Sequence, residues 1–171
     1  MVLFPFALGG IVAIVVLLAV SAFFSSSETA IFSLSPEWFD AQAATGDPRG
    51  RTLKELHDDP HRLLVTLLVG NNVVNIAISS IVTVLVASSL PSGSAVVVTT
   101  LFTSVLVLIF GEIVPKSFGL GNAERWSLTV AGPVRLVERA LSPLISILDW
   151  ITRRMNALIS GDANIEKPYT D

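Results

Sequence analysis

The feature that most constrains this chain is the absence of charge over long stretches. No residue between Arg62 and Glu112 carries a charged side chain, and neither does any residue from Val2 to Phe24. A bilayer core about 30 Å thick needs roughly 20 consecutive apolar residues in each helix that crosses it. Both stretches meet that length, so the chain is predicted to be an integral membrane protein.

The longer uncharged stretch divides into two spans. Residues 88–94 have the sequence SSLPSGS, which combines proline, glycine and serine in a turn signature. The first stretch is too long for the core of a signal peptide and has no basic region before it, so it is interpreted as a retained span. The predicted spans cover about residues 3–34, 62–88 and 95–120.

The distribution of basic residues predicts the orientation. Lysine and arginine are absent from the N-terminus and from the turn at residues 88–94. They occur in the segment between the first two spans and again after the third span. Because short cytoplasmic loops carry an excess of these residues, we expect a multi-pass cell-membrane protein with its N-terminus outside and its C-terminus in the cytosol.

Two further helical regions are expected on the cytosolic side. Ser35 and Pro36 supply a helix N-cap and a first-turn proline, and two short helices around a turn predict a helical hairpin over about residues 36–58. Residues 133–159 alternate arginines with apolar residues three to four positions apart, which is typical of an amphipathic helix in the membrane interface. Residues 161–171 show no periodicity and are interpreted as a disordered tail.

The predicted fold class is therefore an all-α integral membrane protein. It has three transmembrane helices, a cytosolic helical hairpin and an amphipathic juxtamembrane belt helix, and residues 1–160 form the transmembrane domain. Its environment is the lipid bilayer. Nothing in the sequence indicates an enzyme or a nucleic-acid partner.

Polar residues interrupt the apolar pattern at four places. They are Ser25 to Glu28 after the first apolar run, Asn71, Asn72 and Asn75 in the second span, the scattered threonines and serines of the second and third spans, and Glu112 in the third. An ionisable residue inside a span is costly and by default indicates a functional site. The simpler explanations are a solvated helix end for the serines, hydrogen bonds between helices for the asparagines, and the end of the third span for Glu112.

The spacing of these residues favours a common site. Asn71 and Asn75 are four residues apart and share one helical face, whereas Asn72 points about 100° away. Asn75 lies about 20 Å along its helix from Arg62, and Glu112 lies about 25 Å into the third span. Pro115 also frees a backbone carbonyl near Glu112. The depths are compatible with a meeting of all three groups inside a three-helix bundle.

The chemistry of this set is that of oxygen ligands. A carboxylate, amide oxygens, hydroxyls and freed carbonyls suit hard cations such as Mg²⁺ and Ca²⁺, whereas zinc and copper prefer thiolate and imidazole. The chain has no cysteine, and both of its histidines, His57 and His61, precede the second span. That position also leaves the serines without a base for hydrolytic chemistry. The residues alone leave Na⁺, Mg²⁺ and Ca²⁺ open.

Three ordered segments carry a family resemblance. They are FSSSETAIFSLSP (24–36), LLVTLLVGNNVVNI (63–76) and FGEIVPKSFGL (110–120), one on each predicted span. Together they resemble the transmembrane domain of the cyclin M / CorB / CorC magnesium transporter family. The resemblance implies a homodimer that transports Mg²⁺, commonly described as efflux and proposed to be coupled to Na⁺. It also implies cytosolic CBS modules that bind Mg–ATP, which would follow the tail and are absent from this chain.

The resemblance further implies a set of site residues. The ligands of a largely dehydrated Mg²⁺ would be Ser25, Asn71, Asn75, Glu112 and the main chain near Gly111. Glu28 and Ser26 are assigned to a second ion, such as Na⁺, or to the access path, and Asn72 is expected to be structural. Two other functions stay open: a transporter of Na⁺ or other divalent cations, and a membrane anchor and dimerisation platform for cytosolic modules.

Overall fold

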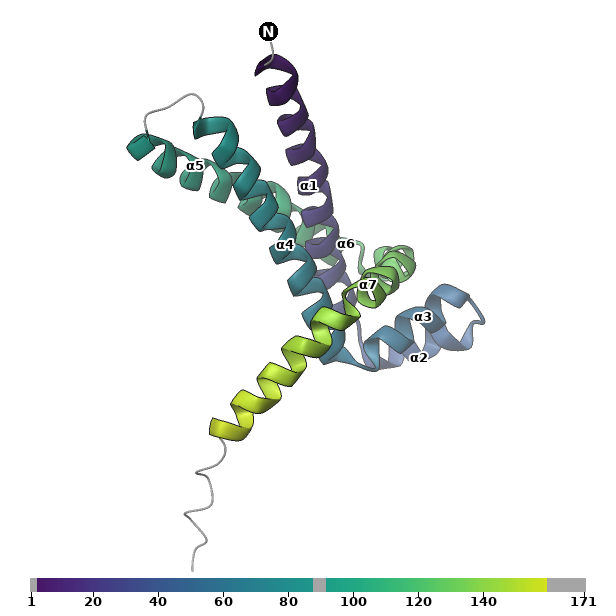
Figure 1. The fold of residues 1–171 in the computed structure, drawn as a ribbon. Coiled ribbons are helices and arrows are strands. Elements are labelled where there is room, and N and C mark those ends of the chain that lie inside the picture. Colours follow the sequence, from purple (N-terminus) through teal and green to yellow (C-terminus); the bar gives the residue numbers. More distant parts are fainter. Residues whose placement is uncertain (1–2, 88–91, 160–171) are drawn as a thin grey trace, which may run out of the picture.

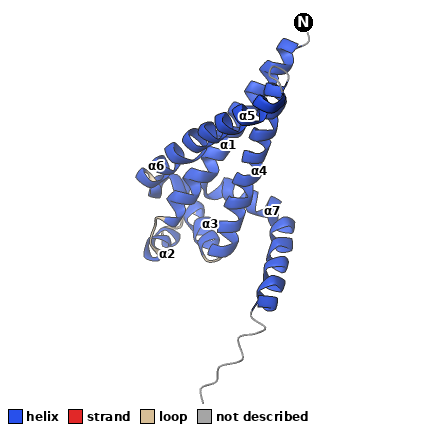
Figure 2. Ribbon diagram, turned by 90° about the vertical axis from the view of Figure 1, so that its left-hand side faces the viewer, coloured by secondary structure: helices blue, strands red, loops and turns tan. Residues whose placement is uncertain are grey.

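The computed structural model describes residues 3–87 and 92–159, and every regular element in those ranges is a helix (Figures 1 and 2). The elements in chain order are α1 (Leu3–Phe32), α2 (Pro36–Ala44), α3 (Pro48–His57), α4 (Pro60–Ala87), α5 (Ser92–Leu106), the π-helix η1 (Val107–Ile113), α6 (Val114–Gly121) and α7 (Ala123–Ile159). Most of the predicted turn at residues 88–94 and the whole predicted tail lie outside the described residues.

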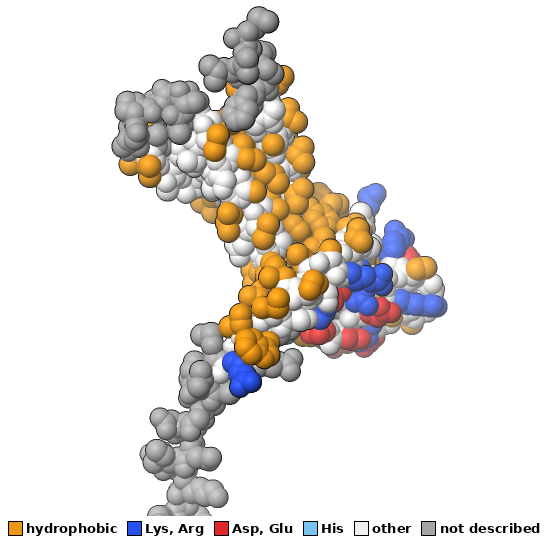
Figure 3. All heavy atoms as spheres, in the orientation of Figure 1, with side chains coloured by type: hydrophobic (Ala, Val, Ile, Leu, Met, Phe, Trp, Pro, Cys, Tyr) orange, Lys and Arg blue, Asp and Glu red, His pale blue; other side chains and the backbone are white. Residues whose placement is uncertain are grey.

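Three helical stretches are long and apolar enough to cross a bilayer. They are Ala7–Phe32, Pro60–Val86 and Val96–Gly121, the last of which runs continuously through α5, η1 and α6. Large apolar side chains cover their outer faces, as at Ile76 and Leu101. Most charged side chains visible in Figure 3 gather instead over α2, α3 and the adjacent part of α7. The predicted all-α membrane fold with three spans is confirmed.

Close helix packing in the bundle depends on small residues. A Cβ atom added to Gly70 of α4 would lie 2.5 Å from Cζ of Phe24, whose ring packs against that position. A Cβ atom added to Gly119 of α6 would overlap the carbonyl oxygen of Ser26. Inside a bilayer, such glycines allow helix backbones to approach closely and gain packing contacts. They bring α4 and α6 against the same part of α1.

The two short helices of the predicted hairpin are present. Ser35 caps α2, and Asp47 caps α3 by accepting a 2.8 Å hydrogen bond from the backbone N–H of Arg49. The Arg49 side chain also donates to this carboxylate and holds its pKa below the usual range. A Cβ atom at Gly50 would lie 2.5 Å from the carbonyl oxygen of Gln42, so the crossing of α2 and α3 requires glycine. The cytosolic location of the hairpin stays a prediction.

Helix α7 is longer than the predicted belt helix. It begins at Ala123 rather than near Pro133, and both Pro133 and Pro143 lie inside it. The sequence favoured a start at Pro133 because proline suits the first turn of a helix and removes a hydrogen bond from its interior. In the structure, the first turns of α7 pack on the bundle through Trp126 and the fully buried Ser127. This packing extends the helix towards its N-terminus.

An ion-pair network fixes α7 to the start of α4. The carboxylate of Glu138, which is 7% exposed, lies between Arg62 at 2.5 Å and Arg135 at 2.8 Å. Arg62 also donates to Ser142 of α7, and Arg135 donates to Glu55 of α3 at 3.1 Å. A buried carboxylate is tolerated when it is paired in this way. The network therefore joins α3, α4 and α7 at the end of the bundle where the charges gather.

The contact between α6 and α1 can be tested by replacing Gly119 with alanine. The added methyl group has no room against the Ser26 carbonyl, so we expect the free energy of unfolding to fall by about 1–3 kcal/mol. The measurement is the thermal unfolding of the purified protein in detergent. Gly121→Ala is the matched control, because nothing lies within 4 Å of a Cβ atom at that position. Equal midpoints for the two variants would contradict the packing argument.

Candidate cation site

The polar residues of the first two spans meet at a single hydroxyl group. Oγ of Ser21, a residue with no exposed surface, lies 2.9 Å from Oδ1 of Asn71 and 2.9 Å from Oδ1 of Asn75. The two asparagines reach the same atom because they are one helical turn apart on α4. The predicted common face of these two residues is confirmed. Asn72, which was expected to point elsewhere, is exposed and lines a neighbouring groove to which Asn75 also contributes.

Two amide oxygens compete for the single hydroxyl hydrogen at this junction. A serine hydroxyl carries one hydrogen, so Ser21 donates to only one of the two amide oxygens at a time. Ser25 lies one turn further along the same face of α1, fully buried, and its Oγ has no hydrogen-bond partner. Buried polar atoms without partners are rare and costly. Two amide oxygens that converge next to an unpartnered hydroxyl inside a membrane are an arrangement that a cation would stabilise.

The third span meets the junction at an irregular turn. A Cβ atom added to Gly111 would lie 2.7 Å from Oγ of Ser21, so glycine is needed where η1 crosses α1. The backbone N–H of Val114 bonds to the carbonyl of Ile109, five residues back, as in a π-helix. Pro115 has no N–H, so the carbonyl of Gly111 loses the donor that residue 115 would provide in a regular helix. Such π-turns are frequent at functional sites.

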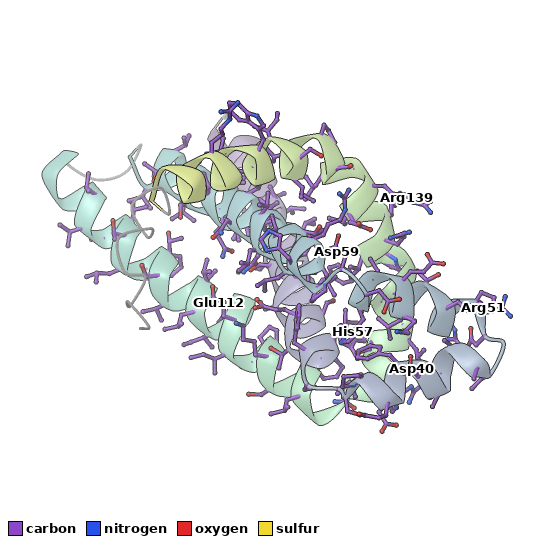
Figure 4. All side chains as sticks on the ribbon, turned by 90° about the horizontal axis from the view of Figure 1, so that it is seen from below. Asp40, Arg51, His57, Asp59, Glu112 and Arg139 are labelled. Carbon is purple, nitrogen blue, oxygen red and sulfur yellow. The ribbon has the colours of Figure 1, made fainter. Side chains whose placement is uncertain are left out.

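Glu112 lies beside this junction in a polar cleft between α4 and α5. Figure 4 shows its side chain pointing from η1 towards α1. The cleft has a volume of about 440 Å³ and is lined by Asn75, Ser79, Thr83, Thr99, Thr100, Thr103, Ser104, Val107, Leu108 and Glu112. Asn75 thus belongs both to the Ser21 junction and to the cleft that holds Glu112. The structure brings the predicted amide and carboxylate groups to one region.

The other two predicted residues have structural partners. Oγ of Ser26 accepts a 3.0 Å hydrogen bond from the indole N–H of Trp126 in α7 and donates to the carbonyl of Ala22 at 2.7 Å. The carboxylate of Glu28 lies 3.7 Å from the ammonium group of Lys116 in α6. These contacts attach α1 to α7 and α6. The assignment of Ser26 and Glu28 to a second ion or an access path stays a prediction.

Sequence reasoning missed Ser21. It treated residues 2–24 as one uncharged run, in which a single serine does not indicate a site. The available signal was the four-residue spacing between Ser21 and Ser25, which places both hydroxyls on one face of α1. The unpartnered hydroxyls of Thr99 and Thr103 in the cleft were also not singled out, because threonines in a span usually bond to their own helix.

The charge available to a bound ion is small. Among the residues that the structure describes, no three histidine, cysteine, aspartate or glutamate side chains cluster as metal ligands. A cation at the junction would therefore receive one negative charge from Glu112 and otherwise neutral oxygens. This donor set fits a hard cation rather than a transition metal.

Comparison with known proteins establishes the family. Residues 12–171 match the family described as the Cyclin M transmembrane N-terminal domain. The chain belongs to this family. The match covers the first span from residue 12 onwards, the other two spans, the hairpin and α7, so the cyclin M domain includes every part of the molecule that forms the junction.

Relatives of this cyclin M domain occur in plants and bacteria. A chloroplastic DUF21 domain-containing protein of Arabidopsis thaliana is 34% identical over 90% of the chain. A UPF0053 protein of Haemophilus influenzae is 27% identical over 90% of it, and the inner membrane protein YfjD of Escherichia coli is 28% identical over 85%. The chain spans only 23%, 36% and 34% of these three proteins, respectively.

The contact between Gly111 and Ser21 predicts a measurable coupling. Gly111→Ala alone should destabilise the cyclin M domain, because the new methyl group meets Oγ of Ser21. In a Ser21→Ala background the nearest atom of residue 21 is its Cβ at 3.5 Å, an ordinary contact, so the same change should cost less. The expected coupling in a double-mutant cycle is about 0.5–3 kcal/mol of unfolding free energy. Additive effects in thermal unfolding would show that the two residues do not touch.

Proposed function

We propose that this chain is the ion-conducting membrane domain of a magnesium transporter. The transported Mg²⁺ is held at the meeting point of α1, α4 and η1. Glu112 supplies the negative charge. The neutral ligands are the hydroxyl of Ser25, the amide oxygens of Asn71 and Asn75, and the carbonyl of Gly111. The protein moves the ion between the two sides of the membrane by alternating exposure of this site.

The observation that carries the proposal is the convergence of two amide oxygens on the hydroxyl of Ser21. Two amide oxygens converge on one hydroxyl hydrogen, and the next hydroxyl on the same face has no partner. A purely structural polar contact between helices would match donors with acceptors, as Ser26 and Trp126 do nearby. Unmatched oxygens inside a span are explained by a cation that binds there during part of the transport cycle.

Mg²⁺ is favoured over other hard cations by the family. The oxygen donors suit Na⁺, Mg²⁺ and Ca²⁺ alike, and the three sequence motifs that contain Ser25, Asn75 and Glu112 resemble those of magnesium transporters. Mg²⁺ gives up its water molecules reluctantly. The single carboxylate and the freed carbonyl would offset that cost at a site without bulk water. The proposal includes efflux coupled to Na⁺, a homodimer, and an extracellular N-terminus.

The direct test is Glu112→Gln in proteoliposomes. Glutamine keeps the size and one oxygen but removes the only carboxylate of the cleft, so Mg²⁺ flux should fall at least roughly tenfold, equivalent to about 1.4 kcal/mol or more. Flux is measured with a Mg²⁺-sensitive dye, under imposed Na⁺ and Mg²⁺ gradients. Size-exclusion chromatography and thermal unfolding check that the variant is folded. Unchanged flux would reject the transport site and favour the membrane-anchor function.

A second test uses the two faces of α4. Asn75→Ala should weaken Mg²⁺ binding in calorimetry, because it removes one of the two converging oxygens. Asn72→Ala should leave binding unchanged, because this exposed amide is absent from the lining of the cleft. The two variants differ by three positions on the same helix, so general effects of losing an asparagine cancel. Equal weakening would contradict the assignment of the site to one face.

A further inference from the structure

The cleft between α4 and α5 continues well beyond Glu112. On α4 its lining residues are Asn75, Ser79 and Thr83, each four positions after the last, so they form one polar stripe about 12 Å long. The facing stripe on α5 begins at Thr99 and ends at Glu112 in η1. The stripes lead from the candidate cation site towards the end of α4 and the start of α5. Figure 1 shows these ends on the same side of the bundle as the N-terminus.

Two hydroxyls in the wall of this cleft are buried without partners. Thr99 is 6% exposed and Thr103 is 5% exposed, they lie one turn apart on α5, and neither Oγ1 has a hydrogen bond. Neighbouring hydroxyls follow the usual solution in a span, in which Thr83 donates to Ser79 and Thr100 donates to Val96 of their own helices. Both threonines line the cleft, and their Oγ1 atoms are enclosed by protein.

From Val96 onwards, every polar side chain of α5 lines the cleft. Leu101 and Val105 occupy positions adjacent to Thr100 and Ser104 in sequence, are 63% and 56% exposed, and do not line the cleft. Lipid acyl chains suit the apolar face but cannot form hydrogen bonds with a hydroxyl group. The helix therefore separates a lipid-facing surface from a surface suited to water.

We propose that the α4–α5 cleft is a water-filled passage between the candidate cation site and the membrane side that holds the N-terminus. This inference rests on the proposed transport function and adds the route to it. Neutral hydroxyls replace part of the hydration shell of a passing cation without trapping it, as weak multiple sites do in other ion paths. Glu112, the only ionisable residue among the described residues that line the cleft, is then where the ion binds.

The natural absence of cysteine allows a clean accessibility test. Single-cysteine variants Thr100→Cys and Ser104→Cys are reconstituted and treated, from the side of the N-terminus, with a membrane-impermeant cationic methanethiosulfonate reagent. Leu101→Cys and Val105→Cys are the controls, at nearly the same depth on the lipid-facing side. We expect the cleft variants to react at least tenfold faster than their neighbours, and added Mg²⁺ to slow the reaction of Ser104→Cys. Thr83→Cys and Val84→Cys repeat the comparison on α4.

The outcomes separate the passage from the transport site. Equally slow reaction at cleft and control positions overturns the passage. The passage is also overturned if the cleft cysteines of two chains form disulfide cross-links with each other and do not react with the reagent, because a second copy of the chain would then fill the cleft. If Glu112→Gln retains full flux while the cleft cysteines react quickly, the transport site fails and the cleft is still water-filled. If flux depends on Glu112 but the cleft cysteines stay unreactive, the site stands and the passage is rejected.

Discussion

The arrangement of the bundle depends on one hydroxyl group in a place without bulk water. Oγ of Ser21 lies 2.9 Å from two amide oxygens of α4 and occupies the space that a Cβ atom of residue 111 in η1 would need, so all three spans meet at this atom. In a bilayer, polar groups must find partners within the protein, and hydrogen bonds between helices therefore select how the helices pack. The Ser21 contact sets the rotation of α1 against α4 and leaves a space that only glycine can occupy on the third span.

The irregularity of the third span follows from the same contact. The π-turn inserts an extra residue where η1 crosses α1, and Pro115 one turn later withholds a donor from the Gly111 carbonyl. A regular helix would satisfy that carbonyl internally. Here the carbonyl belongs to the residue that meets Ser21, and Glu112 follows it directly. The departure from regular helix thus coincides with the carboxylate and the converging amides, which is where a cation would need oxygen atoms.

The charged end of the molecule is organised separately from the cation site. Glu138 binds Arg62 at the start of α4 and Arg135 in α7, so α7 is attached to the span that carries the asparagines. The start of α7 is attached to α1 by the hydrogen bond between Trp126 and Ser26. A displacement of α7 would therefore act on both helices that form the Ser21 junction. This is a mechanical connection between the C-terminal helix and the proposed site.

The fold class follows from the sequence alone, because uncharged stretches of spanning length have no stable alternative to membrane helices. The sequence also predicts that Asn71 and Asn75 share a face, since a spacing of four follows from helix geometry. It could not give the start of α7, where packing of Trp126 and Ser127 overrides the signal of Pro133. Nor could it give the partners of Ser26 and Glu28, which lie on other helices far along the chain.

The grouping of the polar residues depends on how the helices pack against one another. Periodicity assigns a side chain to a face of its own helix, but the rotation and crossing of two helices depend on packing between residues distant in the sequence. Ser21 lies within an apolar run of the sequence, and only the packing of α4 places two amides against it. Thr99 and Thr103 differ from other threonines of the spans only in being unpartnered residues that line a cleft. Composition shows that oxygen atoms are present in the spans, whereas their convergence is a property of the assembled helices.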